Sequence, residues 1–202
     1  MTYTGIDNQT YNHLPYPLPG RHQAINTAIA LATLEVLHKK HAFQLAFTDV
    51  PHNLLQVCWP GRLERIQVCR EAETFTYLFD GAHNEAGIRT LSNALHDLGV
   101  GQFVLVWGSM KDKTLATQWQ ALLKRADNII FTQAEPERSA RPEQLFALAD
   151  QAVRYRIRCR ENVVDALKLA ELTARHHMII CVAGSLHLVG KARSLIVNTQ
   201  TT

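Results

Sequence analysis

The chain has 202 residues, of which 47% are hydrophobic and 19% charged, and its formal net charge is +3 with an isoelectric point near 8.7. This composition is typical of a globular protein built as one large domain, or as one domain and part of another. No block of Lys and Arg with interleaved aromatic residues is present, which argues against nucleic-acid binding. No apolar run is long enough to cross a membrane.

The first part of the chain predicts little regular structure apart from one long helix. Residues 1–21 are polar and rich in proline, so we expect an extended or irregular segment. Apolar residues at helical spacing predict a helix over residues 22–40 with a wide apolar stripe. His38 and His41 have the spacing of two metal ligands, but no third ligand is near. We therefore interpret them as a solvated helix end and predict no metal site.

A boundary follows this helix. Residues 42–60 form a connector with one short helical piece, and Trp59-Pro60-Gly61 has the composition of a break between domains. We therefore predict two parts, residues 1–60 and residues 61–202.

From Arg62 onward, apolar strands alternate with amphipathic helices. The first two strands are joined by a short polar turn and should pair antiparallel. The later strands are separated by helices, which requires crossovers and favours an α/β fold with a mostly parallel sheet of about six strands, covered by helices on both faces. The expected strands are 62–68, 75–80, 103–107, 128–132, 155–159 and 178–183, and the expected helices are 85–98, 114–126, 142–153, 162–176 and 185–197.

The four cysteines form no CxxC pair. We interpret them as free, buried thiols in a reducing cytosol, and so expect a cytoplasmic protein. They are Cys58, Cys69, Cys159 and Cys181.

One corner of the predicted sheet carries the strongest functional signal. A strand stops at Asp80, turns at Gly81 and opens a helix that Asn84 can cap. Asp80 and His83 should then lie above the carboxyl end of a strand and beside a helix N-terminus, where open α/β sheets bind ligands. The alternative is a structural turn with a capping Asp. Three polar residues in one corner favour a binding site.

Other candidate residues are less specific. Ser185 follows the last strand, and its hydroxyl can equally cap the last helix or contact a ligand. Lys113 and Arg141 follow two other strands, where their cations can meet phosphate or carboxylate, although both also suit solvated loops. Asn26 lies among apolar residues near the start of the first helix, and its residue context alone favours a local hydrogen bond.

The sequence lacks a loop that cradles nucleotide phosphates. Gly184–Lys191 has five residues between its glycines instead of four, and Ala192 stands where Ser or Thr would hold magnesium. A GxGxxG motif is also absent. Either the chain is no ATPase, or the domain that cradles ATP lies elsewhere.

Four motifs together resemble the folylpolyglutamate synthases of the Mur ligase superfamily. They stand in the family's order: GRHQAIN at 20–26, WPGRLER at 59–65, DGAHN at 80–84 and AGSLHLVG at 183–190. The resemblance implies that residues 1–60 are the helical tail of a missing central ATPase domain with its linker. It implies that residues 61–202 are a Rossmann-like Mur ligase C-terminal domain.

The resemblance also implies a reaction. A parent ligase of this family uses ATP to activate the γ-carboxyl of tetrahydrofolate as an acyl phosphate, which L-glutamate then attacks, and some members also act on dihydropteroate. The expected cofactors are ATP and Mg²⁺, with Mg²⁺ bound by the missing N-terminal ATPase domain. The expected partners are that domain and the small-molecule substrates, and this chain alone should be inactive.

By position, the resemblance assigns four residues to ATP: Asn26 to the adenine, Arg62 and His83 to phosphate, and Asp80 to the ribose hydroxyls. Ser185 is a candidate for the incoming glutamate. Lys113 and Arg141 are candidates for contact with glutamate or phosphate.

Two alternatives remain open. One is a stand-alone nucleotide-binding module of Rossmann-like fold without catalysis. The other is a fragment of a Mur-type ligase that adds an amino acid to a cell-wall precursor. The WPGRLE and GSLHLVG segments favour a folate enzyme over the second alternative.

Overall fold

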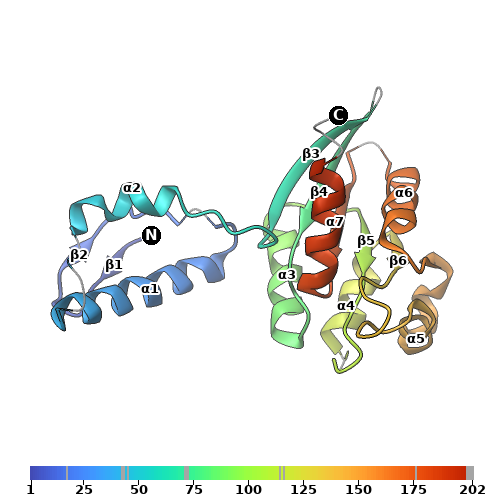
Figure 1. The fold of residues 1–202 in the computed structure, drawn as a ribbon, viewed down its shortest axis with the longest axis horizontal. Helices are drawn as coiled ribbons and strands as arrows, with labels where there is room; N and C mark the ends of the chain where they lie inside the picture. The colour runs from blue at the N-terminus through green and yellow to red at the C-terminus, as the bar shows by residue number, and fades with distance from the viewer. Residues whose placement is uncertain are drawn as a thin grey trace. The chain divides into compact units, whose positions relative to one another are not determined.

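The computed structural model describes residues 1–16, 18–41, 44, 46–70, 73–113, 115, 117–175 and 177–198. It divides into two compact units, Met1–Trp59 and Pro60–Thr202 (Figure 1). No helix in the described part of the chain has both the length and the apolar character needed to cross a membrane. The predicted turn at 71–72 and the predicted helix ends at 114 and 176 lie outside the described residues.

The first unit is more ordered at its start than the sequence indicated. Within the segment expected to be extended or irregular, strand β1 (Tyr3–Thr4) pairs antiparallel with β2 (Thr10–Tyr11), a pairing that the sequence did not predict. Burial accounts for this order, because Tyr3 and Leu14 pack with residues of three later elements in one small apolar cluster. These elements are α1 (Arg21–Lys39), a 3₁₀ turn η1 (Phe47–Asp49) and α2 (Val50–Leu55).

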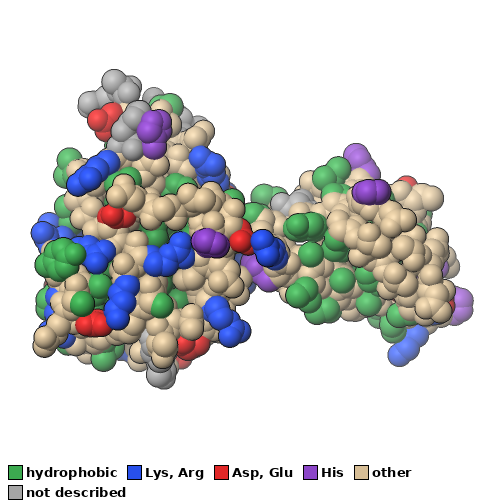
Figure 2. All heavy atoms as spheres, turned by 180° about the vertical axis from the view of Figure 1, so that it is seen from behind, with side chains coloured by type: hydrophobic (Ala, Val, Ile, Leu, Met, Phe, Trp, Pro, Cys, Tyr) green, Lys and Arg blue, Asp and Glu red, His purple; other side chains and the backbone are tan. Residues whose placement is uncertain are grey.

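Helix α1 buries a different face from the one its apolar stripe suggested. Its buried residues include Leu31 and Glu35, whereas Ile25 is 65% exposed and Ile29 is 61% exposed. Glu35 accepts hydrogen bonds from the Tyr3 hydroxyl at 3.0 Å and the Ile6 amide at 2.8 Å, which explains its burial. Figure 2 shows hydrophobic side chains on the surface of this unit.

The second unit contains a six-stranded sheet in the order β3-β4-β8-β5-β6-β7. Strand β3 runs antiparallel to β4 and every other neighbouring pair is parallel, which confirms the predicted topology. The strands are β3 (Glu64–Arg70), β4 (Glu73–Phe79), β5 (Phe103–Trp107), β6 (Asn128–Phe131), β7 (Ile157–Cys159) and β8 (Ile179–Ala183). The helices are α3 (Glu85–Asp97), α4 (Thr117–Arg125), α5 (Pro142–Leu148), the 3₁₀ helix η2 (Gln151–Arg156), α6 (Val163–Thr173) and α7 (Leu186–Asn198).

Helices cover both faces of this sheet. Strand β5 shows why its residues are all apolar: Leu105 and Trp107 point into the core beneath α3 and α4, and Val104 and Val106 into the core beneath α6 and α7. Side chains alternate between the faces of a strand, so a strand covered on both sides needs apolar residues throughout.

Three further predictions need correction, two about the second unit and one about the cysteines. The helix expected over 142–153 ends at Leu148, because Ala149 adopts an extended conformation and Asp150 then caps η2 through the Ala152 amide. Strand β7 accordingly begins at Ile157 instead of 155. Of the cysteines, Cys181 is buried, but Cys159 is half-buried and two are exposed, so the prediction of buried thiols was wrong for Cys58 and Cys69.

Two glycines give opposite expectations for substitution by alanine. Gly184 has a φ of 109°, and a Cβ there would lie 2.7 Å from the Gly108 carbonyl oxygen. Gly184→Ala should lower the free energy of unfolding by at least about 1–3 kcal/mol. Gly190 lies in α7 with nothing within 4 Å of an added Cβ, so Gly190→Ala should raise it by about 0.5–1 kcal/mol. Urea denaturation of both variants measures this. Equal effects of the two substitutions would contradict the described backbone.

Candidate functional site

The sheet has a topological switch point between β4 and β8. The chain leaves β4 to form α3 on one face, and leaves the neighbouring parallel strand β8 to form α7 on the other. Diverging connections leave a crevice at the carboxyl ends of the strands, where open α/β sheets bind ligands. We call the residues at this point, Gly61–Leu63, Asp80–His83 and Gly184–Ser185, the corner.

Asp80 holds two segments of the corner together. Its Oδ1 accepts the Ala82 amide at 2.9 Å, and its Oδ2 accepts the Leu63 amide at 3.1 Å. The Asp80 side chain is therefore placed by its own strand and tied to the turn that precedes β3. Because Asp80 is only 9% exposed, these backbone donors also satisfy a carboxylate that would otherwise be costly to bury.

The turn before β3 is unusual in its backbone. Gly61 has a φ of 73° and Leu63 a φ of 48°, so two of its residues lie in the left-handed region. A leucine there is strained and persists only where its surroundings hold it. The Asp80 carboxylate holds the Leu63 amide, and the Gly81 amide donates to the Gly61 carbonyl at 2.9 Å.

This turn leaves the Arg62 guanidinium available at the corner. Arg62 is half-buried, and its Nη1 lies 3.6 Å from the point that a Cβ on Gly81 would occupy. Among the residues that the structure describes, no side chain or carbonyl forms a hydrogen bond or ion pair with this guanidinium. A positive charge held beside a fixed backbone turn, without a partner, is suited to an anionic ligand.

His83 and Asn84 complete the Asp80 side of the corner. The Nδ1 of His83 lies 2.8 Å from the Gly81 carbonyl oxygen, and since a carbonyl can only accept, Nδ1 carries a proton. The other ring nitrogen, Nε2, is then the atom that can meet a ligand. Asn84 caps α3 by accepting the Gly87 amide at 2.8 Å, as the sequence predicted.

The loop after β8 packs directly against this group. The Gly184 amide donates to the Ala82 carbonyl at 2.9 Å. Ser185 is buried, and its Oγ accepts the Leu188 amide at 3.1 Å, so its hydroxyl caps α7. A capping hydroxyl still carries a proton that it can donate, so the cap does not decide between the two interpretations of Ser185.

Lys113 and Arg141 lie in a second pair of loops at the same edge of the sheet. Lys113 Nζ lies 3.2 Å from the Asp112 carboxylate, and this contact lowers the pKa of Asp112. Arg141 is exposed just before α5. The two loops are joined by the Ala140 amide, which donates to the Ser109 carbonyl at 2.9 Å.

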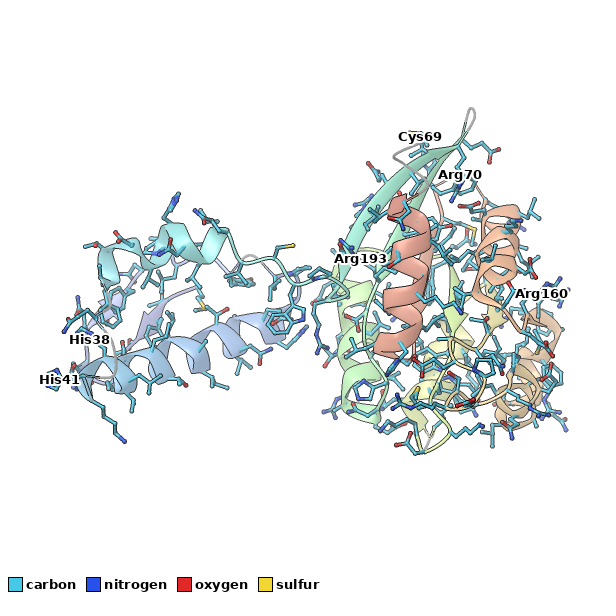
Figure 3. All side chains as sticks on the ribbon, viewed as in Figure 1. His38, His41, Cys69, Arg70, Arg160 and Arg193 are labelled. Carbon is cyan, nitrogen blue, oxygen red and sulfur yellow. The ribbon has the colours of Figure 1, made fainter. Side chains whose placement is uncertain are left out.

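Asn26 belongs to the first unit. It is exposed on α1, and its amide donates to Gln23 Oε1 at 3.0 Å, which is the local hydrogen bond that its context favoured. His38 and His41 lie at the end of the same helix (Figure 3). Within the described ranges, no group of three or more His, Cys, Asp or Glu residues is placed to hold a metal ion.

Sequence reasoning missed several polar groups near the corner. Glu64 accepts the Gly61 amide at 2.9 Å and pairs with Arg193 of α7. Thr132 Oγ1 and Gln133 Oε1, just beyond β6, are buried without a partner in the described part of the chain. A polar pair directly after an apolar strand was the signal that could have identified Thr132 and Gln133. Arg193 carried no such signal.

Two hollows in the described part of the second unit lie away from the corner. One of about 570 Å³ is lined by Gln102, Met178 and residues of the β3–β4 hairpin, and so lies where β5 and β8 begin. Another, of about 700 Å³, is lined by Phe75 and the end of α6. The chemistry of the corner makes it the stronger candidate, since neither hollow combines a partnerless cation with a switch point.

Asp80 should be essential to the fold of the corner. Asp80→Asn replaces one accepting oxygen with an NH₂ group, which leaves a buried backbone amide facing a donor. We expect a loss of about 1–3 kcal/mol in the free energy of unfolding, measured by urea denaturation. Asp112→Asn, on the exposed β5–α4 loop, is the control and should leave the midpoint unchanged. Equal midpoints for the two variants would show that Asp80 does not hold the corner.

Comparisons with known proteins agree with this geometry. The model of the Mur ligase, glutamate ligase domain matches residues 61–186. The dihydrofolate synthase/folylpolyglutamate synthase of Bacillus subtilis is 24% identical over 188 residues, which are 93% of this chain and 42% of the relative. The folylpolyglutamate synthase of Lacticaseibacillus casei is 28% identical over 201 residues, 100% of this chain and 44% of the relative.

A solved structure gives the same result. The folylpolyglutamate synthase of Mycobacterium tuberculosis complexed with ADP superposes with a TM-score of 0.82 at 30% identity, over 96% of this chain and 44% of that one. The chain thus spans less than half the length of these relatives. The family match extends over more than half of the chain and includes the corner, and the chain therefore belongs to the Mur ligase family through its glutamate ligase domain.

Proposed function

We propose that the chain is the C-terminal part of an ATP-dependent ligase that joins L-glutamate to the γ-carboxyl of tetrahydrofolate through an acyl phosphate. The observation that carries the proposal is the Arg62 guanidinium, which is held at a switch-point crevice without a partner among the described residues. The relatives named as folylpolyglutamate synthases, one of them solved with ADP, support the choice of substrates.

Arg62 is the proposed phosphate ligand. Its planar guanidinium can donate two parallel hydrogen bonds to phosphate oxygens. Formation of an acyl phosphate shifts negative charge on the transferred group, so a cation fixed in advance stabilises that charge without reorganising.

His83 and Asp80 complete the proposed nucleotide contacts. The Nε2 of His83 is left for phosphate, because Nδ1 is used by the Gly81 carbonyl. The Asp80 oxygens accept the Leu63 and Ala82 amides. A carboxylate oxygen can accept more than one hydrogen bond, so in this proposal the same side chain also accepts ribose hydroxyls. In this proposal Asp80 both builds the corner and binds the ribose.

The remaining candidates have separate roles in the proposal. Asn26 contacts the adenine after exchanging its hydrogen bond with Gln23 for one with the base. The incoming glutamate has carboxylates, for which Ser185, Lys113 and Arg141 offer a hydroxyl and two cations at the carboxyl edge of the sheet.

The proposal includes a second part of the parent protein, an ATPase domain of which residues 1–60 are the tail. The exposed apolar residues of α1 support this, because a stripe of this kind calls for a covering partner. They are Ile25, Ile29, Val36 and Leu37. Because the sequence has no phosphate loop, the proposal assigns that loop and Mg²⁺ to the missing domain. It also places the parent enzyme in the cytoplasm.

If the phosphate loop and Mg²⁺ belong to the missing ATPase domain, this chain should bind a nucleotide without hydrolysing it. With ATP, tetrahydrofolate and L-glutamate, the purified 202-residue chain should release no ADP above a heat-treated control, because it has no loop to cradle the β- and γ-phosphates. A coupled ADP assay measures this. Folate-dependent ADP release by the chain alone would overturn the proposed division. Failure to bind ADP at millimolar concentration in an NMR titration would overturn the nucleotide site.

Arg62 should dominate that nucleotide binding. Arg62→Ala should weaken ADP binding about tenfold to a hundredfold, the range for a hydrogen bond to a charged group, as measured by NMR titration. Arg158→Ala is the control, since Arg158 lies on the far edge strand β7 and its guanidinium donates to the carbonyls of Tyr155 in η2 and Ile157 in β7. Equal ADP affinity in the two variants would remove Arg62 from the site.

A further inference from the structure

The turn that carries Arg62 is supported from α7 as well as from Asp80. Glu64, two residues after Arg62, accepts the Gly61 amide at 2.9 Å through Oε2. The Nε of Arg193, on α7, lies 2.9 Å from Glu64 Oε1 and 2.8 Å from Oε2. Figure 3 labels Arg193 on this helix. The ion pair therefore links a helix of the core to the backbone immediately before Arg62.

Helix α7 contacts this turn at two points one helical turn apart. A Cβ on Gly61 would lie 2.7 Å from Cγ1 of Val189, so the helix packs tightly against the Gly61 backbone. Val189 and Arg193 are four residues apart and lie on the same side of α7. Val189 limits how far the turn can move toward the helix. The Arg193–Glu64 pair, which binds the Gly61 amide through Glu64, limits how far the turn can move away from it.

The backbone on both sides of Arg62 depends on these contacts. Gly61 and Leu63 both have positive φ angles, which cost energy that neighbouring contacts must offset. Asp80 fixes the Leu63 amide after Arg62, and Glu64 fixes the Gly61 amide before it. Without Arg193, no other cation among the residues that the structure describes pairs with the Glu64 carboxylate, which can then turn toward water and release the Gly61 amide.

We propose that Arg193 is a positioning residue for Arg62: through Glu64 it holds the Gly61–Leu63 turn closed and keeps the Arg62 guanidinium at the corner. The proposal rests on the proposed function for its effect on nucleotide binding. Its effect on the position of Arg62 does not depend on that function and is measured without a ligand.

The same strand provides a matched control. At the other end of β3, Arg70 Nε donates to Glu171 Oε1 at 2.7 Å, and the two side chains are 34% and 15% exposed. The Arg193–Glu64 side chains are 33% and 18% exposed. In both pairs the glutamate keeps a second donor when the arginine is removed, the Tyr77 hydroxyl in one and the Gly61 amide in the other. The two pairs are therefore similar in exposure and in the second donor, and lie at opposite ends of β3.

The experiment compares Arg193→Met, Arg193→Lys and Arg70→Met in the ¹⁵N-labelled chain. The Nε–Hε resonance of Arg62, assigned by its loss in Arg62→Lys, reports the environment of that side chain. Both methionine variants should lower the melting temperature similarly. Of the two methionine variants, only Arg193→Met should move the Arg62 resonance toward the values of exposed arginines. Arg193→Lys should cause a smaller movement, because an ammonium can still pair with Glu64.

ADP binding supplies the second readout. Arg193→Met should weaken it about threefold to tenfold, within the range of coupling measured for interacting residues, and should add nothing in the Arg62→Ala background. Arg70→Met should leave it unchanged. If Arg193→Met does not fold, Glu64→Gln takes its place, since its amide oxygen can still accept the Gly61 amide while the ion pair is lost.

The outcomes separate the two proposals. An unmoved Arg62 resonance in Arg193→Met, or an equal shift in Arg70→Met, overturns the positioning role. A loss of ADP affinity that persists in full in Arg62→Ala also overturns it. A resonance that moves as expected, in a chain whose ADP binding is indifferent to Arg62→Ala, supports the positioning role and rejects the proposed nucleotide contact.

Discussion

The Asp80 carboxylate is the interaction on which the rest of this structure depends. One oxygen accepts an amide of its own loop and the other accepts the amide of Leu63, so a single buried side chain joins the end of β4 to the start of β3. The antiparallel pairing of these strands brings Glu64 opposite Phe79, which places the two loops within reach. The negative charge of Asp80 is stabilised by these backbone amides. In the proposed function, the positive charge of Arg62 beside it binds phosphate.

The two connections that diverge at the switch point supply different residues of the corner. The β4 connection supplies Asp80 and His83 and leads to α3, while the β8 connection supplies Ser185 and leads to α7. Both helices begin at the crevice, so the partial positive charge of each N-terminus adds to that of Arg62. Helix α7 also supports the Arg62 turn through Val189 and Arg193. Helix α7, which begins at the β8 side of the crevice, therefore also supports the turn that carries Arg62 on the β4 side.

Sequence reasoning predicted the parallel sheet, the hairpin and the DGAHN corner, because each follows from local spacing: crossovers need helices, and turns need glycine. It did not predict which face of α1 is buried. The spacing of apolar residues shows that α1 is a helix, but Ile25 is exposed and Glu35 is buried, because Glu35 has hydrogen-bond partners that the sequence does not reveal. It also placed the end of α5 too late, because no Gly or Pro follows Leu148 to indicate that the helix ends there. The Arg193–Glu64 pair joins residues 129 positions apart, and only the fold brings them together. The roles of Asn26, Arg62, Asp80 and His83 toward ATP remain predictions.

The position of β3 at the edge of the sheet has a mechanical consequence. This strand is held on one side only, by β4, and the chain enters it at Glu64, the end nearest the corner. A pull on the chain ahead of Pro60 passes through the corner before it reaches the first pair of the β3–β4 ladder, Glu64 opposite Phe79. The first contacts to bear tension are the hydrogen bonds from the Gly61 amide to Glu64 and from the Leu63 amide to Asp80. Any movement carried along the backbone from residues 1–59 therefore reaches Arg62 before it reaches the sheet, and the corner is the first part of this unit to feel it.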